Sequence, residues 1–321
     1  MDNLRRRACG GIAVALLSTS AAGSALASEP SPSVNPGAFE VVGTYAVPDL
    51  GRETSMDIGP DGRLYVGVQT TDQILVINPD GTLERRIGEH GSGPGQFDFL
   101  RQNGDVIGGV AVASDGTVYV AESRNHRVQA FDPDGHVLRT WGTNGSGDGQ
   151  FQDPIDVAVA PDGTVYVVDD YRDVIQAFTP EGQFLRKIGS HGFGDGQMNF
   201  TCGIEVMADG TVLNADCGNH RIEAWSPDGT FLWTMGSPGT GPGQFNYIGD
   251  VFADPSGLIF SGEPTRIQAF GPDRKVVASW DIPGTTEAVG ANIAFDGHGT
   301  AWVAVGPTLL KLKVLVPGAG T

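Results

Sequence analysis

Short runs of alternating apolar residues recur along the chain, and each run is broken by a turn that ends in glycine. One unit reads Val110-Ala111-Val112, then a turn through Asp115-Gly116, then Val118-Tyr119-Val120. Alternation of this kind predicts half-buried strands, and an Asp-Gly pair between two such runs predicts a tight turn. The pattern therefore predicts antiparallel hairpins repeated along the chain.

The turn glycines give the period of the repeat. They are Gly62, Gly116, Gly163, Gly210, Gly257 and Gly299, separated by 54, 47, 47, 47 and 42 residues. Each unit continues into a third apolar run, such as residues 127–131, and a fourth, such as residues 136–141. A period of this size with four short strands per unit is typical of propeller blades. We predict an all-β fold, a six-bladed β-propeller of four-stranded antiparallel blades.

The last unit lacks a fourth strand, because its pattern ends after residues 309–312. An unpaired edge would remain there and would favour aggregation. Residues 41–48 match residues 276–283 in apolar spacing and in the closing proline. We therefore expect the N-terminal strand to close the ring, so that residues 39–314 form one propeller and residues 315–321 a C-terminal tail.

The N-terminus has the composition of a secretory signal. Arg5, Arg6 and Arg7 precede an apolar run over residues 12–17, and small residues lead to Ala27. This pattern predicts a signal peptide over residues 1–27, followed by a Pro/Ser-rich linker over residues 28–38. We expect a secreted or periplasmic protein, exported by the Sec or the twin-arginine route, with no membrane span. The net charge of -18 argues against nucleic acid or anionic membrane as a partner.

A longer motif resembles the NHL repeat. It runs from Gly142 to Phe151, continues through Asp153-Pro154 and Asp169, and ends in the strand Ile175-Gln176-Ala177-Phe178. Related copies begin at Gly88, Gly189 and Gly236. The resemblance covers residues 39–314 and implies the fold of NHL-repeat six-bladed propellers of the secreted bacterial type. It implies no single function, because enzymes, adhesins and recognition modules share this fold.

Two enzyme families bear a more distant resemblance. Peptidyl-amidoglycolate lyases have a similar propeller whose zinc histidines lie where inner strands enter the pore, but Pro154-Ile155-Asp156 and Cys202-Gly203 contain no histidine. The lyase chemistry is therefore not carried over. Gluconolactonase-like propellers hold a divalent ion with acidic and Asn ligands, and this implies a metal site of similar ligand type here.

Candidate metal ligands come from the position where each inner strand begins. Counting back from the turns gives Ser55, Gly109, Asp156, Gly203, Asp250 and Asn292. Asp156, Asp250 and Asn292 would bring oxygen ligands toward one centre, which suits Ca²⁺ or Mg²⁺, and Zn²⁺ is a further candidate. The alternative is that these side chains accept hydrogen bonds from neighbouring backbone and fix the ring.

A second candidate site is the rim on which the loops between blades lie. An insertion around residues 99–106 enlarges this rim. The candidate ligand-binding residues on it are Glu122, Asp169, Asp170, Tyr171, Asp216 and Glu263. These acids could bind a cation or an amine, or they could form a repeated bridge to Arg127, Arg221 and Arg266. Repetition favours the bridge, although blade 3 has Val174 in place of the arginine.

Two cysteines remain after removal of the signal peptide. Hairpin pairing should bring Cys202 and Cys217 together, and an even pair in an oxidising compartment predicts a disulfide. The alternative adds His220 and gives a Cys, Cys, His set for zinc or copper.

These observations leave two functions open. The first is an exported monomeric propeller that binds an extracellular small molecule, glycan or protein on the pore-mouth rim. The alternative is a divalent-metal-dependent lyase or lactonase-type hydrolase with its site in the central pore. No catalytic set is identifiable in the sequence, and recognition of RNA is opposed by export and by the acidic charge.

Overall fold

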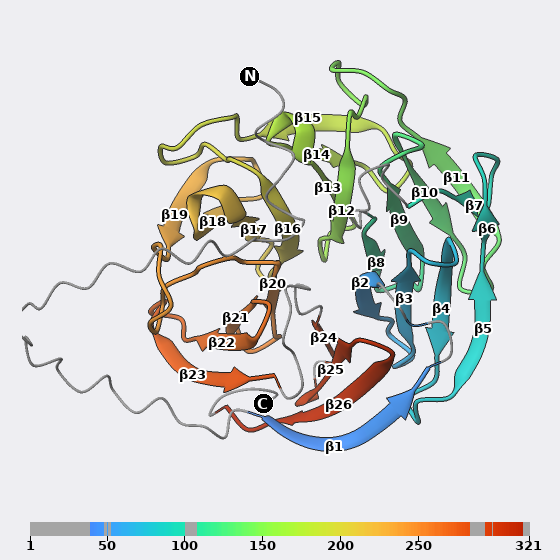
Figure 1. The fold of residues 1–321 in the computed structure, drawn as a ribbon. Coiled ribbons are helices and arrows are strands. Elements are labelled where there is room, and N and C mark those ends of the chain that lie inside the picture. The colour runs from blue at the N-terminus through green and yellow to red at the C-terminus, as the bar shows by residue number, and fades with distance from the viewer. Residues whose placement is uncertain are drawn as a thin grey trace, which may run out of the picture.

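The computed structural model describes residues 39–47, 50, 53–99, 108–282, 293–296 and 298–316. Six four-stranded antiparallel sheets are arranged as blades around a central pore (Figure 1). The predicted fold class is confirmed. The predicted signal peptide, the linker, Asn292 and residues 100–106 of the predicted insertion lie outside the described residues.

In blades 1 to 5 the strands follow the chain from the pore outward. Blade 1 consists of β2 (Glu53–Ile58), β3 (Leu64–Val68), β4 (Gln73–Ile77) and β5 (Leu83–Ile87), and blade 2 of β8 (Val110–Val112), β9 (Val118–Glu122), β10 (Arg127–Phe131) and β11 (Val137–Trp141). Blade 3 consists of β12 (Pro154–Val159), β13 (Val165–Asp169), β14 (Val174–Phe178) and β15 (Phe184–Ile188). Blade 4 consists of β16 (Thr201–Val206), β17 (Val212–Asp216), β18 (Arg221–Trp225) and β19 (Phe231–Met235). Blade 5 consists of β20 (Asp250–Ala253), β21 (Ile259–Gly262), β22 (Arg266–Phe270) and β23 (Val276–Asp281).

Blade 6 combines the two ends of the described chain. It consists of β24 (Ile293–Phe295), β25 (Thr300–Val305), β26 (Thr308–Val314) and, outermost, β1 (Phe39–Ala46). β1 pairs with β26 from Phe39 opposite Val314 to Ala46 opposite Thr308, and the blue and red strands lie side by side in Figure 1. The predicted closure by the N-terminal strand is confirmed, and no free edge remains on β26.

The core lies between neighbouring blades. Between blades 2 and 3, for example, Tyr119 packs in one cluster with Val167 and Phe178. Four loops between blades place a fully buried apolar side chain in such a cluster at the same point of the repeat, namely Phe97, Phe151, Met198 and Phe245. The Gly-Gln-Phe end of the repeat motif is thus explained by packing, because the loop is anchored in the core just before the next inner strand begins.

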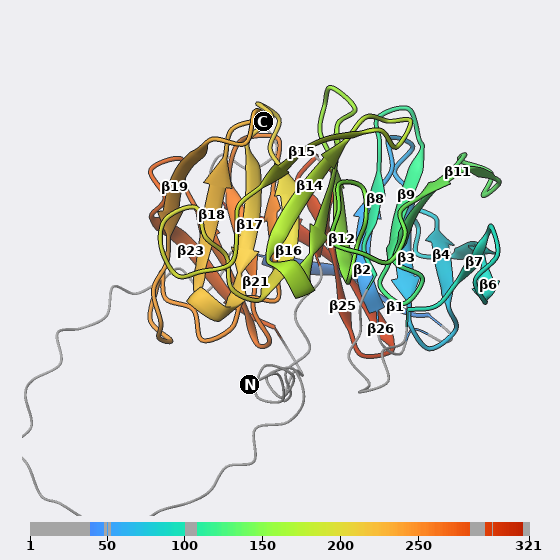
Figure 2. The ribbon, with the colours of Figure 1, turned by 90° about the horizontal axis from the view of Figure 1, so that it is seen from above.

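The remaining described elements lie in the loops. β6 (Glu89–His90) and β7 (Gln96–Phe97) form a short parallel pair, and η2 (Asp170–Arg172) and η3 (Cys217–Asn219) are single turns of 3-10 helix. Seen from the side, the strands run between the two faces of a flattened ring (Figure 2). Within the described residues, no helix is long and apolar enough to cross a membrane.

Candidate functional site

The inner strands enclose a cavity of about 300 Å³ along the ring axis. Its wall carries the side chains of five acidic residues, Asp57, Asp156, Glu205, Asp250 and Asp254. None of the described residues that line it is Lys, Arg or His. The cavity is therefore acidic, with no basic side chain in its described wall to neutralise it.

Two of these carboxylates lie where the sequence placed the metal ligands. Asp156 is on β12 and Asp250 begins β20, and both side chains are buried. Each faces a glycine of the preceding blade: a methyl group on Gly109 would overlap Oδ1 of Asp156, and one on Gly203 would overlap Oδ1 of Asp250. The small residues at these positions therefore provide the space that the two carboxylates occupy.

The two carboxylates differ in their hydrogen bonds. Asp156 accepts from the backbone N–H of Val157 (2.9 Å) and, across the blade boundary, from that of Ile204 (3.0 Å). Asp250 accepts from the backbone N–H of its sequence neighbour Val251, at 2.8 Å. Asp156 therefore has the structural role that was the alternative to metal binding, because its hydrogen bond to Ile204 links blades 3 and 4.

Besides Asp254, which follows β20, two further pore carboxylates were not predicted from the sequence, Asp57 and Glu205. They lie two residues beyond the positions of Ser55 and Gly203, and alternate residues of a strand face the same way. Asp57 accepts from the N–H groups of Ile58 and Val112, both at 2.7 Å, and Glu205 accepts from that of Val206 at 2.8 Å. The signal was present, since each is the polar residue in an apolar-x-apolar inner strand.

Burial raises the pKa of every one of these four carboxyl groups. The pKa of Asp57 rises to about 6, even though two backbone N–H groups oppose the shift. Burial raises the pKa of Asp156 to about 7, and burial together with the charge of Asp57 raises that of Glu205 to about 8. The pKa of Asp250 lies well above its usual value because of burial and the nearby Asp156. A positive charge in the pore would reverse these shifts.

The donor set suits a cation but is not a closed metal cage. Carboxylate oxygens are hard ligands of the kind that Ca²⁺ and Mg²⁺ bind. Among the described residues, two groups place three possible ligand atoms within 4.8 Å of one another, Asp72, His90 and Asp98, and Asp132, Asp134 and His136. Neither group is in the pore, and the described pore residues form no such group. The described pore residues therefore fit an ion that keeps part of its water shell, or an organic ammonium group.

The rim acids Glu122, Asp216 and Glu263 form the repeated bridges. Nε of Arg127 donates to Glu122 at 2.8 Å, that of Arg221 to Asp216 at 2.8 Å, and that of Arg266 to Glu263 at 2.9 Å. All three acids are buried, and burial raises their pKa values. Their arrangement is that of a structural bridge repeated in three blades.

Blade 3 differs, as its missing arginine suggested. Asp169 is buried and accepts the N–H of Asp153 at 2.8 Å and that of Gln152 at 3.1 Å, and burial raises its pKa to about 6. Asp170 and Tyr171 lie in η2, and Tyr171 is 54% exposed. Of the six rim residues, Tyr171 is the one whose side chain is exposed to solvent. Phe99, at the start of the predicted insertion, is instead buried and stacks on Phe97.

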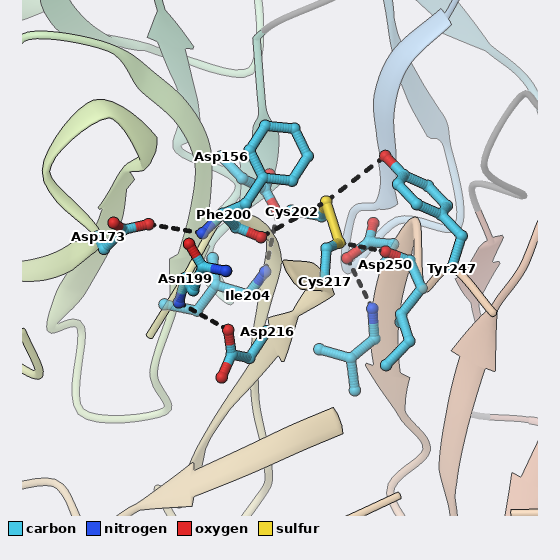
Figure 3. The surroundings of a disulfide bond; sticks show 12 residues. Asp156, Asp173, Asn199, Phe200, Cys202, Ile204, Asp216, Cys217, Tyr247 and Asp250 are labelled. Atoms are coloured by element: carbon cyan, nitrogen blue, oxygen red, sulfur yellow. Dashed lines mark hydrogen bonds between the residues drawn. A yellow bond between two sulfur atoms is a disulfide. The ribbon is translucent and has the colours of Figure 1, made fainter. Parts of the chain in front are cut away.

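Cys202 and Cys217 form the predicted disulfide (Figure 3). Cys202 lies at an irregularity in the pairing of β16 with β17, and Cys217 begins η3. Because the two sulfurs are bonded to each other, they do not form the alternative zinc or copper set with His220.

Comparisons with known proteins agree with this fold. Residues 105–131 match the model of the NHL repeat. No match was found among curated proteins. A structure of virginiamycin B lyase from Staphylococcus aureus is 14% identical over 86% of this chain and 100% of that chain, with a TM-score of 0.61. A gluconolactonase-family structure is 14% identical over 89% and 96% of the two chains, with a TM-score of 0.64.

The same likeness extends to a protein of a different kind. A chain of the mitotic checkpoint complex is 13% identical over 94% of this chain and 99% of its own length, with a TM-score of 0.57. Likeness at this level of identity shows the fold and leaves the function open. The fold is a closed six-bladed β-propeller, and within it residues 105–131, in blade 2, match the NHL repeat.

Proposed function

We propose that this protein is an exported propeller that binds a small positively charged ligand in the mouth of its central pore. The observation that carries the proposal is a set of four pore carboxylates, of which Asp156 and Asp250 are buried and Asp57 and Glu205 half-buried, in a cavity whose described wall contains no basic side chain. Their mutual repulsion and burial are unfavourable without a cation, so that a bound positive charge is stabilised by the same groups.

The ligand class follows from the donors. Asp156 and Asp250 would hold either a divalent ion, with Mg²⁺ and Ca²⁺ as the best candidates, or an organic ammonium group. A divalent ion bound there would supply positive charge and polarise an oxygen of a second ligand. Phe252 and Phe295 line the same cavity beyond the acidic groups, so that an ammonium ligand with an apolar portion also fits. Tyr171 and Asp170 lie on the pore-mouth face, where a larger glycan or peptide ligand would meet the rim.

Calorimetric titration of the metal-free protein tests the proposal. Mg²⁺, Ca²⁺ and 1,4-diaminobutane are added separately, so that the three arms distinguish an inorganic ion from an amine. We expect saturable binding of at least one of them, lost in Asp250→Asn and weakened in Glu205→Gln. Asp148→Asn is the matched control, because Asp148 is an exposed acid paired with Lys187 outside the pore. Equal heats for the wild type and Asp250→Asn would contradict the proposal.

A divalent-metal-dependent lyase or lactonase-type hydrolase is the second candidate. Two carboxyl groups of one cavity with different pKa values support this candidate: the pKa of Glu205 is about 8 and that of Asp57 about 6. At neutral pH such a pair offers a proton donor beside a proton acceptor. The lyase and gluconolactonase neighbours share the fold that would carry this chemistry. Turnover of a simple aldonolactone that requires Mg²⁺ and is abolished in Glu205→Gln would favour this candidate.

A further inference from the structure

The disulfide lies at the boundary between blades 4 and 5, beside the chain that leads to Asp250. The hydroxyl of Tyr247 is 3.5 Å from Sγ of Cys202, and Sγ of Cys217 contacts the carbonyl oxygen of Ile248 (Figure 3). Cys217 and Ile248 are buried in one apolar cluster that joins the two blades. The disulfide therefore packs directly against the two residues that precede Gly249 and Asp250.

Asp250 is held between this segment and blade 4. The N–H of Gly249 donates to the carbonyl of Gly262 at 2.7 Å, which fixes the backbone just before Asp250. On its other side, the Asp250 carboxylate occupies the space over Gly203, and Gly203 directly follows Cys202. One end of the disulfide thus adjoins the residue under the carboxylate, and the other end contacts the segment that carries it.

Asp156 occupies the equivalent position in blade 3 and has a different support. Two backbone N–H groups, of Val157 and Ile204, donate to its two oxygens. The Asp156 carboxylate lies over Gly109. Gly109 is preceded by Gly108, whereas Gly203, under Asp250, is preceded by Cys202. The two principal carboxylates of the proposed site are therefore supported unequally.

We propose that the Cys202–Cys217 disulfide positions the Asp250 carboxylate in the pore, so that reduction of this bond weakens cation binding through Asp250 and leaves Asp156 in place. The proposal rests on the proposed function for its consequence on binding. In the reaction, a dithiol reductant supplies two electrons and two protons, the S–S bond breaks to give two thiols, and the reductant becomes a cyclic disulfide. Two unbonded thiols need more room than the bonded pair, and Cys217, which is buried against Ile248, gains that room only if the segment of Tyr247 and Ile248 moves.

The test follows the titration of the two carboxyl groups by carbon NMR, before and after reduction with dithiothreitol. Signals are assigned with Asp156→Asn and Asp250→Asn, and a thiol reagent verifies that both cysteines are free. We expect the titration midpoint of Asp250 to move more than that of Asp156, which follows only through the charge interaction between the two carboxylates. The affinity for the cation that the oxidised protein binds should fall about two- to tenfold on reduction. An unchanged Asp250 midpoint in the reduced protein would overturn the proposal.

Two sets of variants complete the test. The double variant Cys202→Ala, Cys217→Ala removes the bond without crowding by free thiols, so a moved Asp250 midpoint in this variant would show that the bond itself positions the carboxylate. Gly203→Ala should move mainly the Asp250 midpoint with the disulfide intact, and Gly109→Ala, its matched control, mainly that of Asp156. If neither redox form binds a cation, the proposed function fails, but the Asp250 midpoint still decides whether the disulfide positions it. Complete loss of cooperative unfolding on reduction also overturns the proposal, because the disulfide would then be required for the stability of the whole propeller and would not act on Asp250 in particular.

Discussion

Glu223 in blade 4 occupies the position that Gln176 occupies in blade 3. Both side chains are fully buried, and each accepts the N–H of a glycine in the preceding loop, Gly196 at 3.2 Å and Gly149 at 3.0 Å. Nε2 of Gln176 then donates to the carbonyl of Gln150 at 2.8 Å, whereas Oε2 of Glu223 has no hydrogen-bond partner among the described residues. Burial raises the pKa of Glu223 from 4.5 to about 7. In its protonated form, Glu223 can donate a hydrogen bond as the glutamine does.

This relationship predicts how the variant Glu223→Gln changes stability with pH. The folded protein binds the Glu223 proton more tightly than the unfolded chain, so this residue makes the wild type lose stability as pH rises from about 4.5 through 7. The variant has no proton to lose and should be more stable than the wild type by about 1–3 kcal/mol at pH 9 and little changed at pH 5. The loss of the 3.0 Å ion pair with Arg221 limits the gain. Urea unfolding at the two pH values measures the difference.

Gln176→Glu is the matched control for this prediction. It introduces the same buried acid in blade 3, where Val174 takes the place of the arginine. We expect a loss of stability that grows with pH, opposite in sign to the effect of Glu223→Gln. Parallel pH profiles for the wild type and Glu223→Gln would show that Glu223 does not retain its proton in the folded protein.

The bridge between Arg127 and Glu122 predicts a large effect of removing the arginine. Arg127 also donates to the carbonyls of Ser92, Gly93 and Gln96, at 2.7–2.9 Å. Arg127→Ala would leave a buried acid and these carbonyls without their donor, and it should destabilise the protein by about 3–5 kcal/mol. Arg63→Ala, which removes an exposed pair with Glu84, should cost less than about 1 kcal/mol. Similar unfolding midpoints for the two variants would contradict this assignment.

Much of this fold could be predicted from sequence because its signals are local. The turn glycines adopt positive φ, as Gly116 does at 85°, and each marks the hairpin between an inner strand and the next. The closing strand was predictable from the missing fourth strand of the last unit together with the match of residues 41–48 to residues 276–283. The unpaired acid Asp169 was also foreseeable, since Val174 breaks a pattern that the other bridged blades keep.

The pore site was predicted only in part. Counting one position per inner strand identified Asp156 and Asp250 but missed Asp57 and Glu205, which face the pore two residues further along. The number of N–H groups that reach each carboxylate depends on how neighbouring blades pack, and no pattern within one repeat encodes it. The burial of the rim acids also depends on packing between blades, because the loops that cover these acids follow the preceding blade.

Ring closure predicts the effect of deleting the N-terminal strand. Removal of residues 39–46 would expose the edge of β26 and the cluster in which Phe39 packs on Trp280, with ring centroids 5.4 Å apart. We expect aggregation on expression and loss of a single cooperative transition. Deletion of residues 28–38 is the matched control and should leave unfolding unchanged. A soluble, cooperatively folding protein without residues 39–46 would refute the role of β1 in closure.

The raised pKa values of the pore carboxyls predict how cation binding depends on pH. Because Asp57, Asp156 and Glu205 have pKa values of about 6, 7 and 8, the empty pore carries fewer negative charges at pH 6 than at pH 9. A bound cation favours the ionised forms, so binding must release protons, and affinity should rise with pH over this range. We expect about a tenfold gain or more between pH 6 and pH 9, which corresponds to about 1.4 kcal/mol of binding free energy.

Titrations in buffers of different ionisation enthalpy measure the released protons directly. Glu205→Gln should reduce both the proton release and the pH dependence near pH 8, and an affinity that is constant with pH would show that the ligand does not contact these carboxylates.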